Sequence, residues 1–199
     1  KRQEWVEPQS TDEWYDYTGK KWANAKTSDG SMWVWIPRYA YSITSGYHSS
    51  SAGNIDVEFM KGLTNETSTG RKSFNNASGQ GKWNIHPAFN YGTTVSGIWV
   101  AKYEASSSSS IVVENPSEDQ LANYGYFGSN LKVRVKPNVT SWRAISVGDI
   151  FTVCQNITTT GNSLEGTTNI DSHMMKNTEW GAVAYLSRSQ YGKNSAVYN

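Results

Sequence analysis

The most regular spacing of apolar residues lies in a segment near residue 150. Apolar side chains recur there at i, i+3, i+4 and i+7, the spacing of one helix face, at Ile150, Val153, Cys154 and Ile157. Ser146 stands at the N-cap position and Asp149 follows three residues later, as in a capping box with a shorter acid. The pattern predicts a helix from about Val147 to Ile157 whose apolar stripe is buried.

A second helical pattern runs from Asp171 to Arg188. The same spacing appears at Trp180, Val183, Ala184 and Ser187, which predicts a helix of about three turns. We expect Trp180 to anchor this helix and to share one hydrophobic centre with the stripe from Ile150 to Ile157. No further apolar run follows before Asn199, so we expect a fold that lacks its C-terminal part. A longer gene product or a second chain would complete it.

Alternating patterns predict strands in three other segments. From Met32 to Ile43 the aromatic residues fall on alternate positions, and Pro37 interrupts the run, which indicates a bulge, an edge or a turn. Gly97–Glu104 predicts a second strand. Leu131–Lys136 alternates apolar and basic residues, so we expect its apolar face to be buried and its basic face to lie in solvent.

The segments between these elements are rich in turn-forming residues. Trp14–Ala25 has aromatic residues on both sides of a Thr-Gly-Lys turn, which predicts a β-hairpin too small to be stable alone. Leu63–Lys82 is a long polar loop, the kind of excursion where binding residues concentrate. We therefore divide the chain into an aromatic arm, residues 1–27, and one domain, residues 28–199. The expected fold class is α+β, with short strands, two helices and long loops.

The composition changes this picture mainly through its aromatic residues. The chain has 199 residues, a formal net charge of +1 and no basic stripe, which argues against nucleic-acid binding. It holds 9 Trp and 12 Tyr, and we expect most of these rings in the core and a minority on a recognition surface. The expected core residues are Trp35, Trp99, Trp142, Ile150, Cys154 and Trp180. The expected ligand-binding residues are Trp83, Tyr91, Tyr124, Tyr126, Asn75 and Asn76.

The sequence shows no motif of a catalytic or metal site. The single cysteine, Cys154, excludes an internal disulfide and a multi-cysteine metal site, and its place on the helix stripe predicts a small buried side chain. The three histidines, His48, His86 and His173, lack metal-ligand spacing, and we expect His86 to form structural hydrogen bonds. We expect no enzymatic activity and no cofactor, and we leave a structural calcium ion open, although no motif supports one. No apolar run is long enough to span a bilayer, so we expect no membrane insertion.

Four segments carry short signatures. They are Trp-Val-Trp-Ile-Pro at 33–37, Gly-Ile-Trp-Val-Ala-Lys-Tyr-Glu at 97–104, Asn-Val-Thr-Ser-Trp at 138–142 before the helix with Cys154, and Met174–Tyr185 with its Glu179-Trp180 pair. In this order they resemble the formylglycine-generating, or sulfatase-modifying-factor, family, a branch of the C-type-lectin fold. The resemblance spans Met32 to Arg188 and implies a C-type-lectin-like domain.

The chain also departs from that family. Met175-Lys176 stands where the family has Pro-Thr, and Gly181 stands where it has Glu. The active cysteines and the copper of those enzymes belong to a C-terminal segment without a counterpart here, and Cys154 matches no active position. Catalysis and the calcium sites of the enzymes are therefore not implied. The motifs, with His-Pro-Ala-Phe at 86–89, also resemble a non-enzymatic group from phages, prophages and bacterial surface proteins. Lectin-fold relatives of that group act as receptor-binding tips.

The resemblance implies a non-enzymatic recognition domain on a phage virion or a bacterial cell surface. We expect it to be extracellular, to bind a glycan or a protein receptor, and to associate with copies of itself or with other surface subunits. One alternative is a structural subunit of a collar, decoration or fibre that assembles through exposed aromatic residues, with the N-terminal hairpin as an assembly arm. Another is an oxidase of the formylglycine-generating type, which needs a copper-binding cysteine pair in a further C-terminal segment.

Overall fold

The computed structural model describes residues 16–17, 19–108, 132–143 and 145–193. The described residues form two compact units. Unit 1 takes its residues from Asn24–Val34 and Val100–Met174, and unit 2 takes its residues from Asp12–Ala23, Trp35–Trp99 and Met175–Asn199. Most of the predicted arm lies outside the described residues, so the division of the chain after residue 27 stays a prediction.

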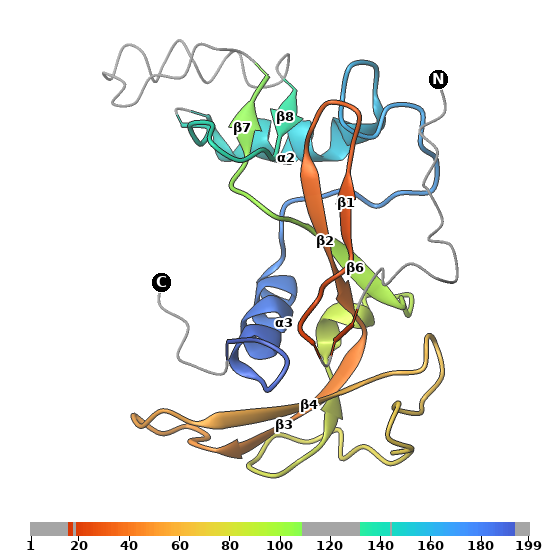
Figure 1. The fold of residues 1–199 in the computed structure, drawn as a ribbon, viewed down its shortest axis with the longest axis vertical. Coiled ribbons are helices and arrows are strands. Elements are labelled where there is room, and N and C mark those ends of the chain that lie inside the picture. Colours follow the sequence, from red (N-terminus) through yellow and green to blue (C-terminus); the bar gives the residue numbers. More distant parts are fainter. Residues whose placement is uncertain (1–15, 18, 109–131, 144, 194–199) are drawn as a thin grey trace. The chain divides into compact units, whose positions relative to one another are not determined.

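Short strands and two α-helices make up the regular structure of the described residues (Figure 1). The strands are β1 Asn24–Lys26, β2 Met32–Pro37, β3 Tyr39–Ser45, β4 Asn54–Phe59, β5 Asn84–Ile85, β6 Gly97–Ala101, β7 Ser106–Ser107 and β8 Val133–Arg134. The α-helices are α2 Val147–Gln155 and α3 Asn177–Arg188, and the 3-10 turns are η1 Pro87–Phe89 and η3 Asn156–Thr158. This mixture confirms the predicted α+β class.

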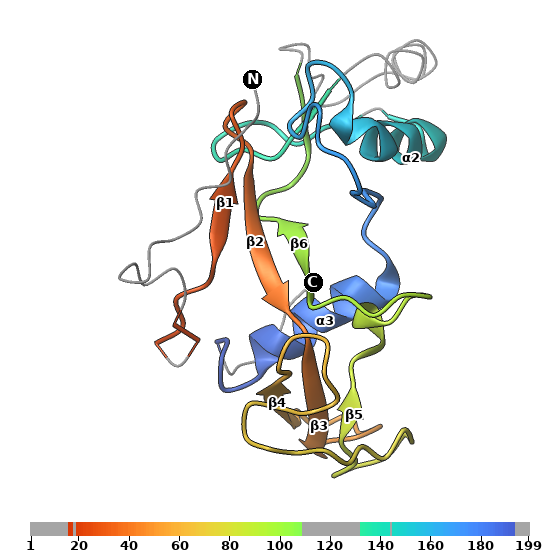
Figure 2. The same ribbon diagram turned by 90° about the vertical axis from the view of Figure 1, so that its right-hand side faces the viewer.

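The strands form three small sheets. Their orders are β1-β2-β6, β4-β3-β5 and β7-β8. Strand β3 pairs antiparallel with both of its neighbours, with Tyr39 opposite Phe59 on one side and Ala40 opposite Ile85 on the other. Figure 2 shows β5 beside β3 and helix α3 next to this sheet. The break that Pro37 predicted is confirmed, because β2 ends at Pro37 and β3 begins at Tyr39.

The core of unit 1 is built around α2. The helix begins as predicted: Ser146 is its N-cap, and the backbone N–H of Asp149 donates to Ser146 Oγ at 3.1 Å. The buried cluster consists of Val133, Val153 and Ile157, with Trp33, Trp142 and Leu164 packed against it. The predicted stripe therefore faces the core, although Ile150 and Cys154 are only half-buried.

A buried polar network also belongs to unit 1. The Asp29 carboxylate accepts hydrogen bonds from the hydroxyl groups of Thr27, Ser31 and Ser163 and forms an ion pair with Arg134, whose Nε lies 2.9 Å from Oδ2. The prediction that the basic face of the segment around β8 lies in solvent is thus wrong for Arg134. A guanidinium can turn inward when a carboxylate compensates its charge, and Asp29 supplies that partner.

Unit 2 has its own core between the sheet β4-β3-β5 and α3. Tyr39 and Phe89 are fully buried with their ring centroids 5.3 Å apart. The hydroxyl group of Tyr39 donates to the carbonyl oxygen of Ala182 at 2.7 Å, which ties β3 to the middle of α3. The small side chain at Ala182 permits this close approach of ring and helix.

The predicted inward face of α3 is wrong. Trp180 is 48% exposed, whereas Glu179, Ala182 and Leu186 are buried. The backbone N–H of Lys176 donates to Glu179 Oε2 at 2.7 Å, and this capping contact turns Glu179 rather than its neighbour toward the protein. Trp180 belongs to unit 2 and the stripe of α2 belongs to unit 1, so the two do not share a hydrophobic centre.

The other predicted core tryptophans are buried only in part. Trp35 and Trp99 lie with their ring centroids 5.2 Å apart in unit 2, and Trp99 remains 36% exposed. Trp142 is half-buried against the core of unit 1. The described part of the predicted N-terminal hairpin forms one antiparallel bridge, between Asp16 and Lys21.

Candidate functional site

The long loop between β4 and β5 is held in place by a buried arginine. Arg38 sits between β2 and β3 and is only 4% exposed. Its guanidinium donates to the carbonyl oxygens of Gly62 and Thr64, at 3.3 and 2.7 Å, and to Asn65 Oδ1 at 3.2 Å. Burial lowers the pKa of Arg38 from its usual value. The contacts fix the first turn of the loop on unit 2.

A bidentate ion pair fixes the middle of the same loop. Arg71 Nε and Nη2 lie 3.1 and 2.8 Å from the two carboxylate oxygens of Glu58 on β4. Thr67 and Thr69 also donate their hydroxyl groups to Glu58 Oε2, at 2.8 and 2.6 Å. Burial by itself raises the pKa of Glu58, but the hydrogen bonds from Arg71, Thr69 and Thr67 outweigh it and hold the pKa below its usual value.

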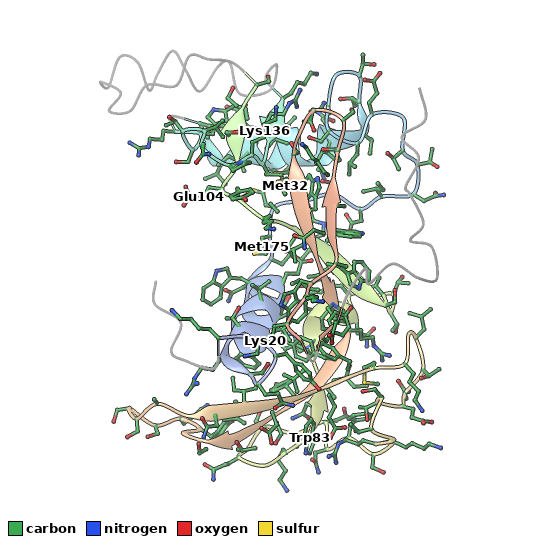
Figure 3. The ribbon with its side chains drawn as sticks, in the orientation of Figure 1. Lys20, Met32, Trp83, Glu104, Lys136 and Met175 are labelled. Carbon is green, nitrogen blue, oxygen red and sulfur yellow. The ribbon has the colours of Figure 1, made fainter. Side chains whose placement is uncertain are left out.

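Three of the predicted ligand-binding residues come together at the end of this loop. Trp83 directly precedes β5 and is labelled in Figure 3. Its backbone N–H donates to Asn75 Oδ1 at 2.7 Å, and the backbone N–H of Asn75 donates to the carbonyl oxygen of Trp83 at 2.7 Å. Asn76 follows with a left-handed backbone, φ 49°, and an exposed side chain. We call Asn75, Asn76 and Trp83, with the adjoining Arg71, the loop surface.

The contacts of the loop surface divide its side chains into two roles. The guanidinium of Arg71 lies 4.1 Å from the ring centroid of Trp83 and covers one face of the indole. The amide oxygen of Asn75 is used inside the loop, so Asn75 positions Trp83. Asn84 closes the turn, since its Oδ1 accepts from the backbone N–H of Ala77 at 3.0 Å. The exposed Asn76 and the partly exposed Trp83 are the groups that this frame presents.

The remaining predicted ligand-binding residues do not join this cluster. Tyr91 follows η1 and is 62% exposed, and the ammonium group of Lys176 lies 4.3 Å from its ring centroid. No contact between Tyr91 and the loop surface appears among the described residues. Tyr124 and Tyr126 lie outside the described residues.

The β3–β4 hairpin contains a pocket that the sequence did not point to. Its volume is about 360 Å³, and we call it the hairpin pocket. It is lined by Ile43, Ser45, Gly46, Tyr47, His48, Gly53, Ile55, Tyr185 and Arg188. Tyr47 and His48 stack with their ring centroids 4.2 Å apart. The two glycines flank a serine-rich hairpin tip in the sequence, which marks the turn but not the pocket, because Tyr185 and Arg188 come from the distant helix α3.

A close backbone contact shapes the mouth of the hairpin. A Cβ on Gly53 would lie 2.1 Å from the carbonyl oxygen of Ser45, and a Cβ on Gly46 would lie 2.5 Å from the Cα of Gly53. Gly46 also has a positive φ of 73°. Both positions therefore require glycine.

His86 has the structural role that its sequence context predicted. It is buried at the N-cap of η1, and its Nδ1 accepts a hydrogen bond from the backbone N–H of Ala88 at 3.3 Å. The rings of Tyr39, Tyr41 and Tyr185 surround it, with centroids within 5.4 Å. Burial lowers the pKa of His86 to about 4, so the imidazole is neutral at neutral pH.

Metal-ligand clusters and membrane-spanning helices are both absent from the part of the chain that the structure describes. No group of three or more His, Cys, Asp and Glu side chains is placed to hold a metal ion within residues 16–17, 19–108, 132–143 and 145–193. Neither α2 nor α3, the described α-helices, has the length and apolar character needed to cross a bilayer.

Burial raises the pKa of the Cys154 thiol, which disfavours the reactive thiolate.

Comparisons with known proteins returned no match for this chain. No protein-family model matches it, and neither a curated protein nor a solved structure matches it significantly.

Proposed function

We propose that the chain is a recognition domain that binds a glycan through the loop surface of unit 2. One observation carries the proposal: the loop that presents Trp83 and Asn76 is already fixed before any ligand arrives. The Asn75–Trp83 hydrogen-bond pair and the Glu58–Arg71 ion pair hold it on the sheet. A surface ordered in advance avoids most of the entropic cost of ordering loops on binding.

The chemistry of the loop surface suits a sugar. The apolar C–H face of a sugar ring packs on an aromatic ring, while amides and guanidinium groups hydrogen-bond its hydroxyl groups. Arg71 covers one face of the Trp83 indole, so the opposite face is the stacking surface in this proposal. Asn76, which follows Asn75 at the exposed turn, supplies an exposed amide for the same ligand in this proposal.

The proposal rests on this surface rather than on the C-type-lectin resemblance. The helical patterns led us to expect a common core for Trp180 and the α2 stripe, which the resemblance needed, and this expectation is wrong. Display on a phage virion or a bacterial cell surface, and a C-type-lectin-like fold, remain part of the proposal through the sequence motifs alone. The alternative of an oxidase stays a prediction.

A glycan array probed with the intact chain tests the proposal, and calorimetry measures the affinity of any hit. We expect Trp83→Ala to weaken binding at least tenfold, about 1.4 kcal/mol or more, as for an aromatic anchor of a binding site. The matched control is Trp180→Ala, which removes an indole that is 48% exposed on α3. It should change the affinity less than twofold. Equal losses in both variants, or no saturable binding to any glycan, would contradict the proposal.

A second candidate function, a structural subunit that assembles through aromatic residues, is favoured by the exposed rings. Trp180, Tyr91 and Phe151 are all about half exposed or more, and exposed aromatic side chains are typical anchors of protein interfaces. Sedimentation of the intact chain over a wide concentration range tests it. A larger assembly that dissociates in the Trp180→Ala variant supports this role, and a monomer at every concentration contradicts it.

A further inference from the structure

The hairpin pocket lies at the outer end of the β3–β4 hairpin, next to the C-terminal half of α3. Ile43 and Ile55 are opposite each other on the two strands and supply apolar lining. Tyr47 and His48 come from the hairpin tip, and Tyr185 comes from α3. The pocket therefore combines aromatic rings and aliphatic side chains around a volume of about 360 Å³.

Arg188 gives this pocket its charge. It lies in the last turn of α3, and its Nη2 donates to the carbonyl oxygen of Gly53 at 2.5 Å and lies 3.5 Å from Asn54 Oδ1. These contacts hold the guanidinium against the hairpin. A guanidinium carries five N–H donors in a planar fork that matches a carboxylate.

The volume limits the size of the ligand. Pockets for small molecules span about 300–1,000 Å³, and the hairpin pocket lies near the lower limit of that range. It has room for one ring and its substituents rather than for a long chain. The stacked pair of Tyr47 and His48, whose planes are 15° apart, offers a flat surface to such a ring.

We infer that the hairpin pocket is a second binding site, separate from the loop surface, for a small six-membered-ring compound that carries a carboxylate. Arg188 binds the carboxylate, and Tyr47, His48 and Tyr185 contact the ring. An acidic sugar and an aromatic acid share this chemistry. The site does not depend on glycan binding at the loop surface, because it uses none of the same residues.

Nuclear magnetic resonance of the ¹⁵N-labelled intact chain tests the site with two acids, D-glucuronic acid and 4-hydroxybenzoate, and with their uncharged counterparts D-glucose and 4-hydroxybenzamide. We expect saturable shifts of the Gly46, Gly53 and Arg188 amides with at least one acid, and binding of its counterpart at least tenfold weaker. The acid that gives saturable shifts identifies the ligand as an acidic sugar or as an aromatic acid. The absence of saturation by both acids, or equal affinity for acid and counterpart, would overturn the inference.

Variants separate the roles of the charge and the ring. Arg188→Gln should weaken binding at least tenfold, while Lys26→Gln removes an equal charge from the exposed end of β1 in unit 1 and should leave binding unchanged. His48 has a positive φ of 51°, a conformation that asparagine tolerates. His48→Asn therefore keeps the backbone conformation and removes the imidazole ring, so it should weaken binding of the acid. This variant gives an independent test if Arg188→Gln fails to fold. Unchanged binding in His48→Asn contradicts the proposed ring contact.

The loop surface serves as an internal control. Trp83→Ala should leave binding of the acid unchanged, because Trp83 does not line the hairpin pocket. Loss of acid binding in this variant would mean that the acid occupies the loop surface, and the inference would fail while the proposed function stood. A chain that binds glycans on the array but neither acid in solution would likewise overturn the inference alone.

Discussion

Burial changes the protonation of single side chains in unit 2. His86 is the clearest case, because its imidazole is enclosed by aromatic rings and accepts a hydrogen bond at Nδ1. Protonation would place an uncompensated charge in this environment and would remove the acceptor. The pKa of His86 is lowered to about 4 from an ordinary 6.5, so the folded state favours the neutral imidazole.

This link predicts how stability depends on pH. The folded pKa of His86 lies below the unfolded value, so its contribution is complete above pH 6.5 and is lost as pH falls toward 4. We expect a loss of about 2 kcal/mol between about pH 7 and pH 5 from this group. Urea unfolding at several pH values measures it.

His86→Asn is the matched variant for that measurement. Asparagine is a favoured N-cap residue, so it can accept the hydrogen bond from Ala88 but does not titrate. The variant should lose about 2 kcal/mol less than the parent chain over the same pH range. Equal slopes for the parent chain and the variant would show that other groups cause the pH dependence. The carboxyl groups of Asp29 and Glu58, whose pKa values are lowered, titrate further toward acid.

Single residues also differ in how far the sequence predicts their roles. The roles of His86 and Val153 follow from signals within a few residues. A proline follows His86, and a helical repeat of apolar residues surrounds Val153. The inward turn of Arg134 depends on Asp29, which lies far away in the sequence. Local alternation cannot reveal such a partner, so the pattern alone places the whole basic face in solvent.

Among the elements, α2 was predictable because its signals are local. The cap at Ser146, the acid at Asp149 and the apolar stripe all fall within one short segment. Helix α3 contains two overlapping stripes, one with Trp180 and one with Glu179, Ala182 and Leu186. The sequence favoured the stripe with the large aromatic residue. The capping contact of Glu179 and the Tyr39 hydroxyl on Ala182 select the other stripe.

The N-cap of α2 contributes to the stability of this helix. Ser146→Ala removes the side-chain acceptor for the Asp149 N–H and should destabilise the chain by about 1 kcal/mol. Thermal or urea unfolding followed by circular dichroism measures this change. Ser146→Thr keeps a hydroxyl group that accepts from the Asp149 N–H and donates to the Asp149 carboxylate, and it serves as the control, with stability close to that of the parent chain. A similar loss in both variants would place the effect outside the cap.

The loop surface and the hairpin pocket differ in how far the sequence reveals them. The long polar loop is visible from its composition, and three of its predicted residues do come together there. The hairpin pocket requires the pairing of β3 with β4 and the arrival of α3 residues beside it. Those are contacts between distant segments, which a single sequence does not display.

For the whole molecule, the division into two units means that each unit depends on its own core and network. Asp29 connects three segments of unit 1: its own turn, through Thr27 and Ser31, and the segments that hold Ser163 and Arg134. Burial raises the pKa of this carboxyl, but the hydrogen bonds outweigh burial and the net pKa is lowered. The charged form is therefore the one that stabilises unit 1.

Asp29→Asn should destabilise unit 1 by about 2–3 kcal/mol, because it leaves the Arg134 charge without its carboxylate. Hydrogen exchange of the intact chain, resolved by residue, should show faster exchange for α2 and β8. The control Asp171→Asn alters a carboxylate that is 84% exposed, and we expect a change within about 0.5 kcal/mol. Unchanged exchange around α2 in Asp29→Asn would contradict the role of the network.

The contact between Gly46 and Gly53 has a practical consequence. It closes the hairpin before the chain enters residues 47–52, so the paired strands do not depend on which residues form the tip. Loop tips of this kind accept foreign segments more readily than paired strands do. Exchanging the tip for an epitope between the two glycines should therefore display the peptide and leave the sheet intact, which would make unit 2 a scaffold for engineering.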